Sequence, residues 1–150
     1  ARSGQEDEAQ RRVDITTLLQ ELCAERGAVW SGGPAACVTG RPVALRRVFG
    51  NLIDNALRYA GDAAVSVAHE GAQVVVRVAD TGPGIPDDRL AAMFAPFARG
   101  DHSRNTQTGG AGLGLSIAQT LVNAHAGQVT LRNGETGGLV AEVRLPSGDQ

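Results

Sequence analysis

The chain has 150 residues, 42% of them hydrophobic, and a formal net charge of −2 at pH 7. This length predicts a single domain, and the apolar fraction is large enough to fill its core. The small net charge argues against nucleic-acid binding, which usually needs a basic surface. No run of about 18 apolar residues occurs, so no part of this sequence is expected to cross a membrane.

The start of the chain and its cysteines indicate a reducing, cytosolic setting. Residues 1–12 are charged and polar without the apolar core of a signal peptide, so we expect a flexible leader that follows an upstream element. Cys23 and Cys37 lack the Cys-x-x-Cys spacing of a metal or redox site. We interpret both as small packing residues.

Short strands and two helices are predicted in the first part of the chain. A strand is expected at 13–15, a helix at 16–26 that ends at Gly27, and strands at 29–30 and 36–39. Pro42 suits the first position of a second helix, which runs from 43 to 60 and ends at Gly61.

This second helix has two contrasting faces. At about 100° per residue, one face is apolar: Leu45, Phe49, Leu52, Ile53, Ala56, Leu57 and Ala60. The opposite face carries Asn51, Asn55 and Arg58, with Asp62 beyond the helix end. Asparagine is a poor helix-interior residue, so these positions indicate a binding function. On the helix alone, an ordinary solvated face remains an equally good interpretation.

The second half of the chain predicts an α+β fold. Two alternating segments around Gly71 predict a hairpin with one buried face, and a second such hairpin is expected near the end. The expected elements are strands at 63–69 and 72–79, a short helix at 86–94, a polar loop at 98–108, a glycine-rich turn at 109–114, a helix to 126, strands at 129–133 and 139–145, and a tail at 147–150. Together they predict a mixed, mostly antiparallel sheet covered on one face by helices.

Three further stretches can carry chemistry, although each has a plain structural alternative. Asp80 to Ile85 follows a strand and can aim a carboxylate into a cleft, or can be a simple turn. Gly109 to Gly114 opens a helix, where free N–H groups bind phosphate, or is a flexible linker. It matches neither a Walker A motif nor a dinucleotide fingerprint. Phe94 and Phe97 are either core residues or the hinge of a lid.

In order and spacing, these stretches resemble the N, G1, F and G2 boxes of the ATP-binding domain of bacterial sensor histidine kinases. The segments are Asn51 to Tyr59, Asp80 to Ile85, Phe94 to Phe97 and Gly109 to Leu115. That domain belongs to the gyrase–Hsp90–histidine kinase–MutL superfamily, and the resemblance covers residues 13–146. It implies a two-layer α/β sandwich of the Bergerat type, with an ATP lid at about 98–111.

The resemblance also implies a role for each matched residue. Asn55 matches the Mg²⁺ ligand, Arg58 a phosphate contact, and Asp80 the carboxylate that accepts from the adenine amino group. The remaining implied ATP contacts are Asn51, Tyr59, Gly82, Gly84, Ile85, Arg99, Arg104, Gly110, Ala111, Gly112, Leu113, Gly114 and Leu115. Asn51 and Arg58 are the implied catalytic positions.

Two departures from the family pattern bear on function. None of His69, His102 and His125 lies in a phosphoacceptor motif, so we expect the dimerisation and phosphoacceptor domain to be outside this sequence. The hydrolysing branches of the superfamily carry Glu where this sequence has Asn51, and Asn is not a general base. The resemblance therefore implies transfer of phosphate with negligible hydrolysis.

The resulting hypothesis is the catalytic fragment of a sensor histidine kinase. It binds Mg²⁺ and ATP and donates the γ-phosphoryl group to a histidine of the phosphoacceptor domain, with a response regulator downstream. We expect a weakly associating or monomeric fragment, cytoplasmic within a membrane-anchored protein. The alternatives are an anti-sigma-factor-type serine kinase of the same superfamily and a nucleotide-sensing domain without transfer.

Overall fold

The computed structural model describes residues 9–82, 106–134 and 138–148, with the backbone alone for 106–114. The elements are β1 (Arg11–Asp14), α2 (Ile15–Arg26), β2 (Val29–Gly32), β3 (Cys37–Gly40), α3 (Pro42–Ala60), β4 (Ala64–Glu70), β5 (Gln73–Ala79), α5 (Thr106–Ala124), β6 (Gln128–Asn133) and β7 (Leu139–Pro146). Among these residues, no helix combines the length and hydropathy needed to cross a membrane.

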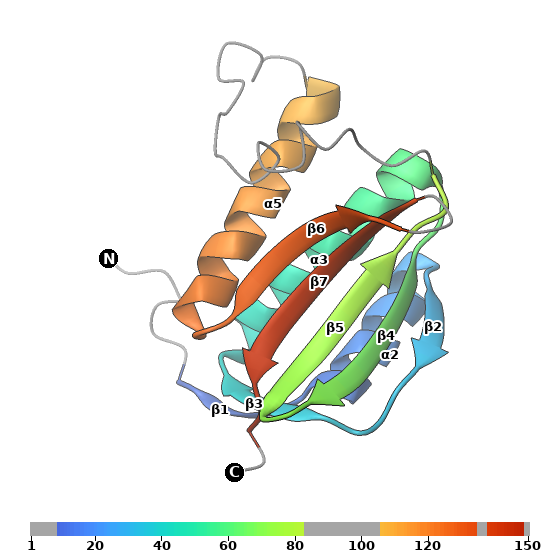
Figure 1. Cartoon of the computed structure of the whole chain (residues 1–150). Helices are drawn as coiled ribbons and strands as arrows, with labels where there is room; N and C mark the ends of the chain where they lie inside the picture. The colour runs from blue at the N-terminus through green and yellow to red at the C-terminus, as the bar shows by residue number, and fades with distance from the viewer. Residues whose placement is uncertain (1–8, 83–105, 135–137, 149–150) are drawn as a thin grey trace.

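The fold has two layers, a sheet and a set of helices behind it. The strands of a five-stranded sheet follow the order β2-β4-β5-β7-β6, and only the β2–β4 pair is parallel. Figure 1 shows α2, α3 and α5 together on one face of this sheet. The predicted α+β fold with a mixed, mostly antiparallel sheet is confirmed, whereas the separate antiparallel ribbon of β1 and β3 was not predicted.

The core lies between α3 and the inner face of the sheet. Phe49 and Ile53 are fully buried, as are Val65 and Val76 on the strands. The predicted apolar face of the helix is therefore the core face, because a one-sided sheet needs one apolar stripe to cover it. Leu57 is only partly buried against this core.

Local chemistry explains where two of the helices begin and end. The side chain of Asp14 accepts a 3.0 Å hydrogen bond from the Thr17 N–H and so caps α2. Pro42 starts α3. Gly27 and Gly61 end α2 and α3 with φ values of 76° and 82°, which only glycine adopts without strain.

The structure differs from the predicted boundaries at the start of the domain and adds contacts at its end. Arg11 and Arg12 were assigned to the leader, but they pair with β3 in β1. Ile15 was assigned to a strand, but it begins α2 because Asp14 caps the helix there. At the other end, the backbone N–H groups of Ser147 and Gly148 donate to Ala72 and Cys37, so this part of the predicted tail is attached to the fold.

The glycine-rich segment 109–114 was predicted as a turn before a helix, but its backbone is helical. It lies inside α5, which begins at Thr106. The range from 106 to 124 contains no proline, and the high helix propensity of its alanines and leucines offsets the low propensity of its glycines. The predicted turn with free N–H groups is therefore absent from this structure.

The end of α5 also differs from the prediction that Gly127 terminates it. The helix ends at Ala124, and Ala126 adopts the left-handed conformation with φ of 63°. Gly127 is needed for a different reason, because a Cβ there would lie 2.3 Å from the carbonyl oxygen of Arg144. The predicted helix at 86–94, the loop residues 98–105, and Phe94 and Phe97 lie outside the described residues. The last part of the predicted loop, 106–108, was wrong, because these residues form the start of α5.

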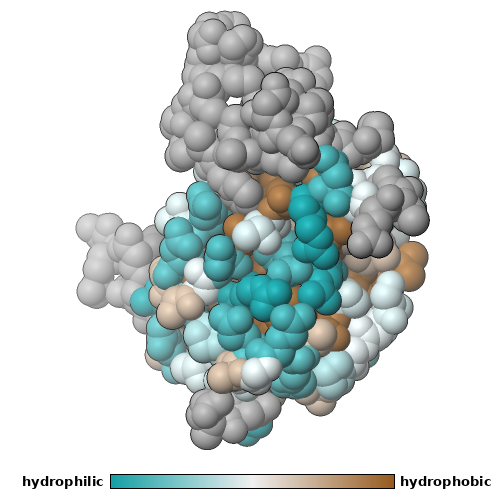
Figure 2. Space-filling view, in the orientation of Figure 1, coloured by the Kyte–Doolittle hydropathy of each residue, from teal (hydrophilic) through white to brown (hydrophobic). Residues whose placement is uncertain are grey.

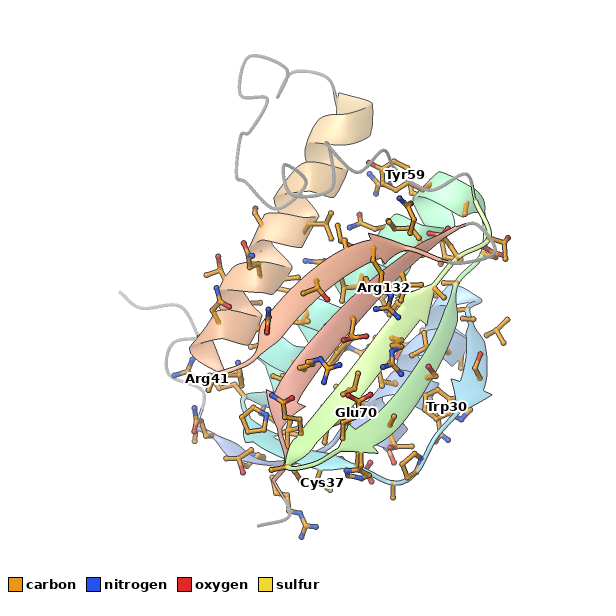
Figure 3. The ribbon with its side chains drawn as sticks, viewed as in Figure 1. Trp30, Cys37, Arg41, Tyr59, Glu70 and Arg132 are labelled. Carbon is orange, nitrogen blue, oxygen red and sulfur yellow. The ribbon has the colours of Figure 1, made fainter. Side chains whose placement is uncertain are left out.

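The open face of the sheet carries a charged network around Glu142, whose side chain is 8% exposed. Its carboxylate accepts hydrogen bonds of 2.8–2.9 Å from Arg77, Arg132 and Arg144. Glu70 accepts from Arg77 and Arg144 at 3.0 and 2.8 Å. Figure 2 shows hydrophilic residues gathered over this face, and Figure 3 shows Glu70 and Arg132 on it. The helices therefore cover one face, and ion pairs cover the other.

Candidate functional site

A pocket opens between α3 and the strands that follow it. It is open to solvent, and its space of about 340 Å³ includes part of that solvent. Most of its wall is apolar, and three of its side chains, Asn55, Tyr59 and Asp80, can form hydrogen bonds with a ligand. The lining residues are Leu52, Asn55, Ala56, Tyr59, Val78, Asp80, Leu115, Leu131, Leu139 and Ala141.

Asp80 lies just beyond β5 and is held by backbone groups. Its N–H donates to the Leu139 carbonyl at 3.0 Å. Its Oδ1 accepts from the N–H groups of Leu139 and Gly82, at 3.1 and 3.0 Å. Both bonds reach the same oxygen, so Oδ2 keeps its capacity to accept from a ligand. The carboxylate is thus aimed before any ligand arrives.

Two glycines allow the chain to pass closely around Asp80. Gly138 has a φ of 79°, and a Cβ there would lie 1.9 Å from the Asp80 carbonyl oxygen. A Cβ on Gly82 would lie 2.9 Å from the Cβ of Ala60, near the end of α3. Larger residues at these positions would push apart the elements that form this side of the pocket.

Asp62 and Thr81 connect the end of α3 to the turn that carries Asp80. The Thr81 N–H donates to Asp62 Oδ1 at 3.1 Å, and its hydroxyl donates to Oδ2 at 2.6 Å. The side-chain hydrogen bond from Thr81, followed by the backbone one, lowers the pKa of Asp62. The sequence placed Asp62 with the ligand-binding stripe, but in the structure it binds Thr81.

Asn55 lies one helical turn from Tyr59 on the pocket side of α3. Its side-chain amide nitrogen is buried and has no hydrogen-bond partner within the described part of the chain. A buried amide nitrogen without a hydrogen-bond partner is destabilising, and such groups in proteins normally donate to a water molecule or a ligand. The amide group of Asn55 is therefore available to a ligand.

The structure brings together four of the predicted site residues: Asn55, Tyr59, Asp80 and Leu115 all line the pocket. Figure 3 shows Tyr59 at the end of the molecule opposite Cys37. Gly82 lies beside them through its bond to Asp80. Asn51 and Arg58 are on α3 but do not line the pocket, and Arg58 is exposed.

The other predicted contacts cannot be placed as side chains. Gly84, Ile85, Arg99 and Arg104 lie outside the described residues. For Gly110, Ala111, Gly112, Leu113 and Gly114 only the backbone is described, and it belongs to α5.

The sequence did not predict the apolar wall that the last hairpin contributes. Leu131, Leu139 and Ala141 reach the pocket from β6 and β7. The alternation of apolar and polar residues in these strands predicted a buried face. Only the pairing of β5 with β7 places that face next to Asp80.

His125 and Cys23 are packing residues of the fold and lie outside the pocket. His125 is buried, where its Nε2 accepts from the Arg41 N–H at 3.1 Å and its Nδ1 contacts the Leu121 carbonyl at 2.7 Å. Burial raises the pKa of the Cys23 thiol, which keeps it protonated. Across 9–82, 106–134 and 138–148, no three His, Cys, Asp or Glu side chains form a metal cluster.

Comparisons with known proteins agree with this fold. Residues 40–149 match the family described as histidine kinase-, DNA gyrase B-, and HSP90-like ATPase. The chain is 39% identical over 138 residues to the sensor histidine kinase GtrS of Pseudomonas aeruginosa, covering 89% of this chain and 28% of that protein. It is 38% identical over 146 residues to the histidine-protein kinase BaeS of Escherichia coli, covering 89% of this chain and 31% of that protein.

Solved structures show the same similarity. The ATP-binding domain of PrrB from Mycobacterium tuberculosis superposes with a TM-score of 0.76 at 25% identity, covering 95% of this chain and 100% of that one. Full-length ShkA in complex with AMPPNP gives a TM-score of 0.73 at 27% identity, covering 94% of this chain and 32% of that one.

The chain therefore belongs to the family of histidine kinase-, DNA gyrase B- and HSP90-like ATPases. Within it, the similarity is to the ATP-binding domain of bacterial sensor histidine kinases, which confirms the resemblance that the four boxes indicated. The chain spans 28% and 31% of the length of the two curated relatives, GtrS and BaeS.

Proposed function

We propose that this domain binds Mg²⁺ and ATP and donates the γ-phosphoryl group to a histidine on the phosphoacceptor domain of a sensor histidine kinase. The observation that carries the proposal is the pocket in which an aimed carboxylate, Asp80, and an unpaired amide, Asn55, share an otherwise mostly apolar wall. A flat apolar base with one exocyclic amino group fits that combination.

Adenine recognition is assigned to Asp80. Its Oδ1 is occupied by two backbone donors, so Oδ2 accepts from the adenine amino group. Guanine presents a carbonyl oxygen where adenine has that amino group, and two acceptors facing each other are unfavourable. The site should therefore select ATP over GTP. Leu131, Leu139 and Ala141 supply apolar contact for the base.

Asn55 is assigned to Mg²⁺ through its side-chain amide oxygen. The fit rests on the place of Asn55 in the pocket wall and on the preference of Mg²⁺ for few protein oxygens together with phosphates and water. Which amide atom is O and which is N follows from the partner it meets. Mg²⁺, when bound, supplies charge neutralisation at the phosphates.

Phosphate binding is assigned to Arg58, to Arg99 and Arg104 of the proposed lid at about 98–111, and to the backbone of Gly110, Gly112 and Gly114. The backbone N–H groups of these glycines become free only if the start of α5 opens. Glycine is about 1 kcal/mol less favourable than alanine in a helix interior, so opening the helix at these glycines requires little free energy. Leu113 and Leu115, with Gly84 and Ile85, complete the proposed contacts.

Asn51 favours phosphoryl transfer over hydrolysis. An amide cannot remove a proton from water at neutral pH, so the domain holds ATP without activating water against it. The nucleophile must then come from a partner, and we propose a histidine in the part of the protein that lies outside this sequence. A response regulator is the proposed acceptor downstream, and we place the domain at the cytoplasmic side of a membrane-anchored sensor.

Mixing this chain with a separately produced phosphoacceptor domain and γ-labelled ATP tests the proposal. We expect label on the acceptor only with Mg²⁺, and label that acid removes but base does not, as for phosphohistidine. Acid-stable label would instead support a serine kinase. The Asp80→Asn variant is the negative control. ATP binding without any transfer would contradict the kinase proposal and support a nucleotide-sensing domain.

A further inference from the structure

At the rim of the pocket, Asp62 and Thr81 connect its two sides through side-chain hydrogen bonds. Asn55 and Tyr59 belong to α3, whereas Asp80 belongs to the turn after β5. Gly61 ends α3 with a φ of 82°, and this reversal presents Asp62 to Thr81. The helix and the turn thus meet through residues that do not line the pocket themselves.

This contact, termed the fork, consists of two hydrogen bonds that the Asp62 carboxylate accepts from Thr81. Asp62 Oδ1 accepts the Thr81 N–H at 3.1 Å and Oδ2 accepts the Thr81 hydroxyl at 2.6 Å. Two bonds between the same partners define the orientation of Thr81 as well as its distance from α3. A single bond would define this orientation less tightly.

The fork acts on the groups that aim Asp80. Thr81 lies between Asp80 and Gly82, and the Gly82 N–H donates to Asp80 Oδ1 at 3.0 Å. A Cβ on Gly82 would meet Ala60 at 2.9 Å, so the turn is also in close contact with the end of α3. Any displacement of Thr81 moves the Gly82 N–H and releases one of the two bonds that hold the carboxylate.

We propose that Asp62 and Thr81 are positioning residues for nucleotide selection: they set Asp80 at a defined place relative to Asn55 without touching the ligand. This inference rests on the proposed function. Asp62 and Thr81 are at the surface, where hydrogen bonds between exposed groups add little to the stability of the fold. Their effect should therefore be seen in ATP binding and in the preference for ATP over GTP.

Calorimetric titration of this chain with Mg²⁺–ATP and with Mg²⁺–GTP tests the inference. We expect Asp62→Ala to weaken ATP binding by roughly 10-fold, as for loss of an aligned hydrogen bond, and to leave weak GTP binding unchanged. Thr81→Val removes the hydroxyl donor but keeps the backbone N–H, so it should weaken ATP binding less than Asp62→Ala does. The double variant should be no worse than Asp62→Ala alone. Thr81→Ser keeps both the hydroxyl and the backbone N–H donors, so it should retain most of the wild-type affinity for ATP.

Asp54→Ala is the matched control. Asp54 is an exposed carboxylate on α3, and it accepts a 3.0 Å hydrogen bond from Arg26 rather than from the turn. Its loss should leave ATP affinity unchanged. If Asp62→Ala fails to fold, Thr81→Val carries the test.

Two results separate this inference from the proposed function. If ATP binding depends on Asp80 but Asp62→Ala changes neither the ATP affinity nor the ratio of ATP to GTP affinity, the positioning role alone is overturned. Additive effects of Asp62→Ala and Thr81→Val would also overturn it, because they would indicate independent contacts. A wild-type chain that does not bind ATP would overturn both.

Discussion

The backbone N–H of Leu139 donates a 3.1 Å hydrogen bond to the side-chain Oδ1 of Asp80, and the Leu139 carbonyl accepts the Asp80 N–H at 3.0 Å. A residue at the start of β7 thereby orients the side chain that follows β5, although 59 positions separate them. These two bonds fix the Asp80 carboxylate to the edge of β7, so its position follows that of the sheet.

Asp80→Asn should lower ATP affinity at least about 100-fold while the fold remains intact. Asparagine can still accept from Leu139 and Gly82 through its one side-chain oxygen, so the turn is retained. Its NH₂ group then faces the adenine amino group, and two donors oppose each other. Titration calorimetry measures the affinity, and Asp54→Asn is the control. Unchanged affinity in Asp80→Asn would refute the assignment.

Asn55→Ala should weaken nucleotide binding much more with Mg²⁺ than with EDTA. The amide nitrogen makes no hydrogen bond to the described residues, so its removal should cost little stability. Asn123→Ala, an exposed asparagine on α5, is the matched control. Binding measured with and without Mg²⁺ gives the comparison. Equal weakening in both conditions would argue against Asn55 as the metal ligand.

Glu142→Gln should lower the free energy of unfolding at pH 7 by about 1 to 2 kcal/mol, because charge-assisted hydrogen bonds to three partly exposed arginines are weakened. Burial alone would raise the pKa of Glu142. Hydrogen bonds from Arg132 and Arg77 and the charges of Arg144 and Arg77 outweigh it and lower the pKa from 4.5 to about 2.

A carboxyl group with a lowered pKa in the folded state stabilises the protein above its unfolded pKa, and this stabilisation is lost as pH falls. The wild-type chain should therefore lose its advantage over Glu142→Gln between about pH 4.5 and pH 2. Urea denaturation at pH 7 and pH 3 measures the difference, with Glu21→Gln on α2 as the control. An advantage that is the same at both pH values would contradict this role.

Gly40→Ala should destabilise the fold by about 1 to 3 kcal/mol through overpacking. A Cβ at this position would lie 2.5 Å from His125 Cδ2 and 2.8 Å from Nε2, and the ring is held in place by Arg41 and Leu121. Denaturant melts of Gly40→Ala, His125→Ala and the double variant measure the coupling. The cost of Gly40→Ala should be smaller in the His125→Ala background; additive costs would contradict the clash.

Much of the site was already present in the amino-acid sequence because its signals are local. The spacing of Leu45, Phe49 and Ile53 predicts the core face of α3, since residues three or four apart share one side of a helix. Asn55 and Asp80 were found from a helical asparagine and from a carboxylate at a strand end. Both line the same pocket in the structure.

What the sequence did not reveal depends on residues that meet only in three dimensions. Asp62 looked like a member of the ligand stripe, but its partner is Thr81 on another element. The glycine-rich segment was predicted as a turn from its composition, yet it continues α5, because propensity is a weak preference that the helix as a whole overrides. Local periodicity thus determined the helices, the hairpins and the two key side chains. The pairing of β5 with β7 and the packing at the end of α3 decided how Asp80 is held.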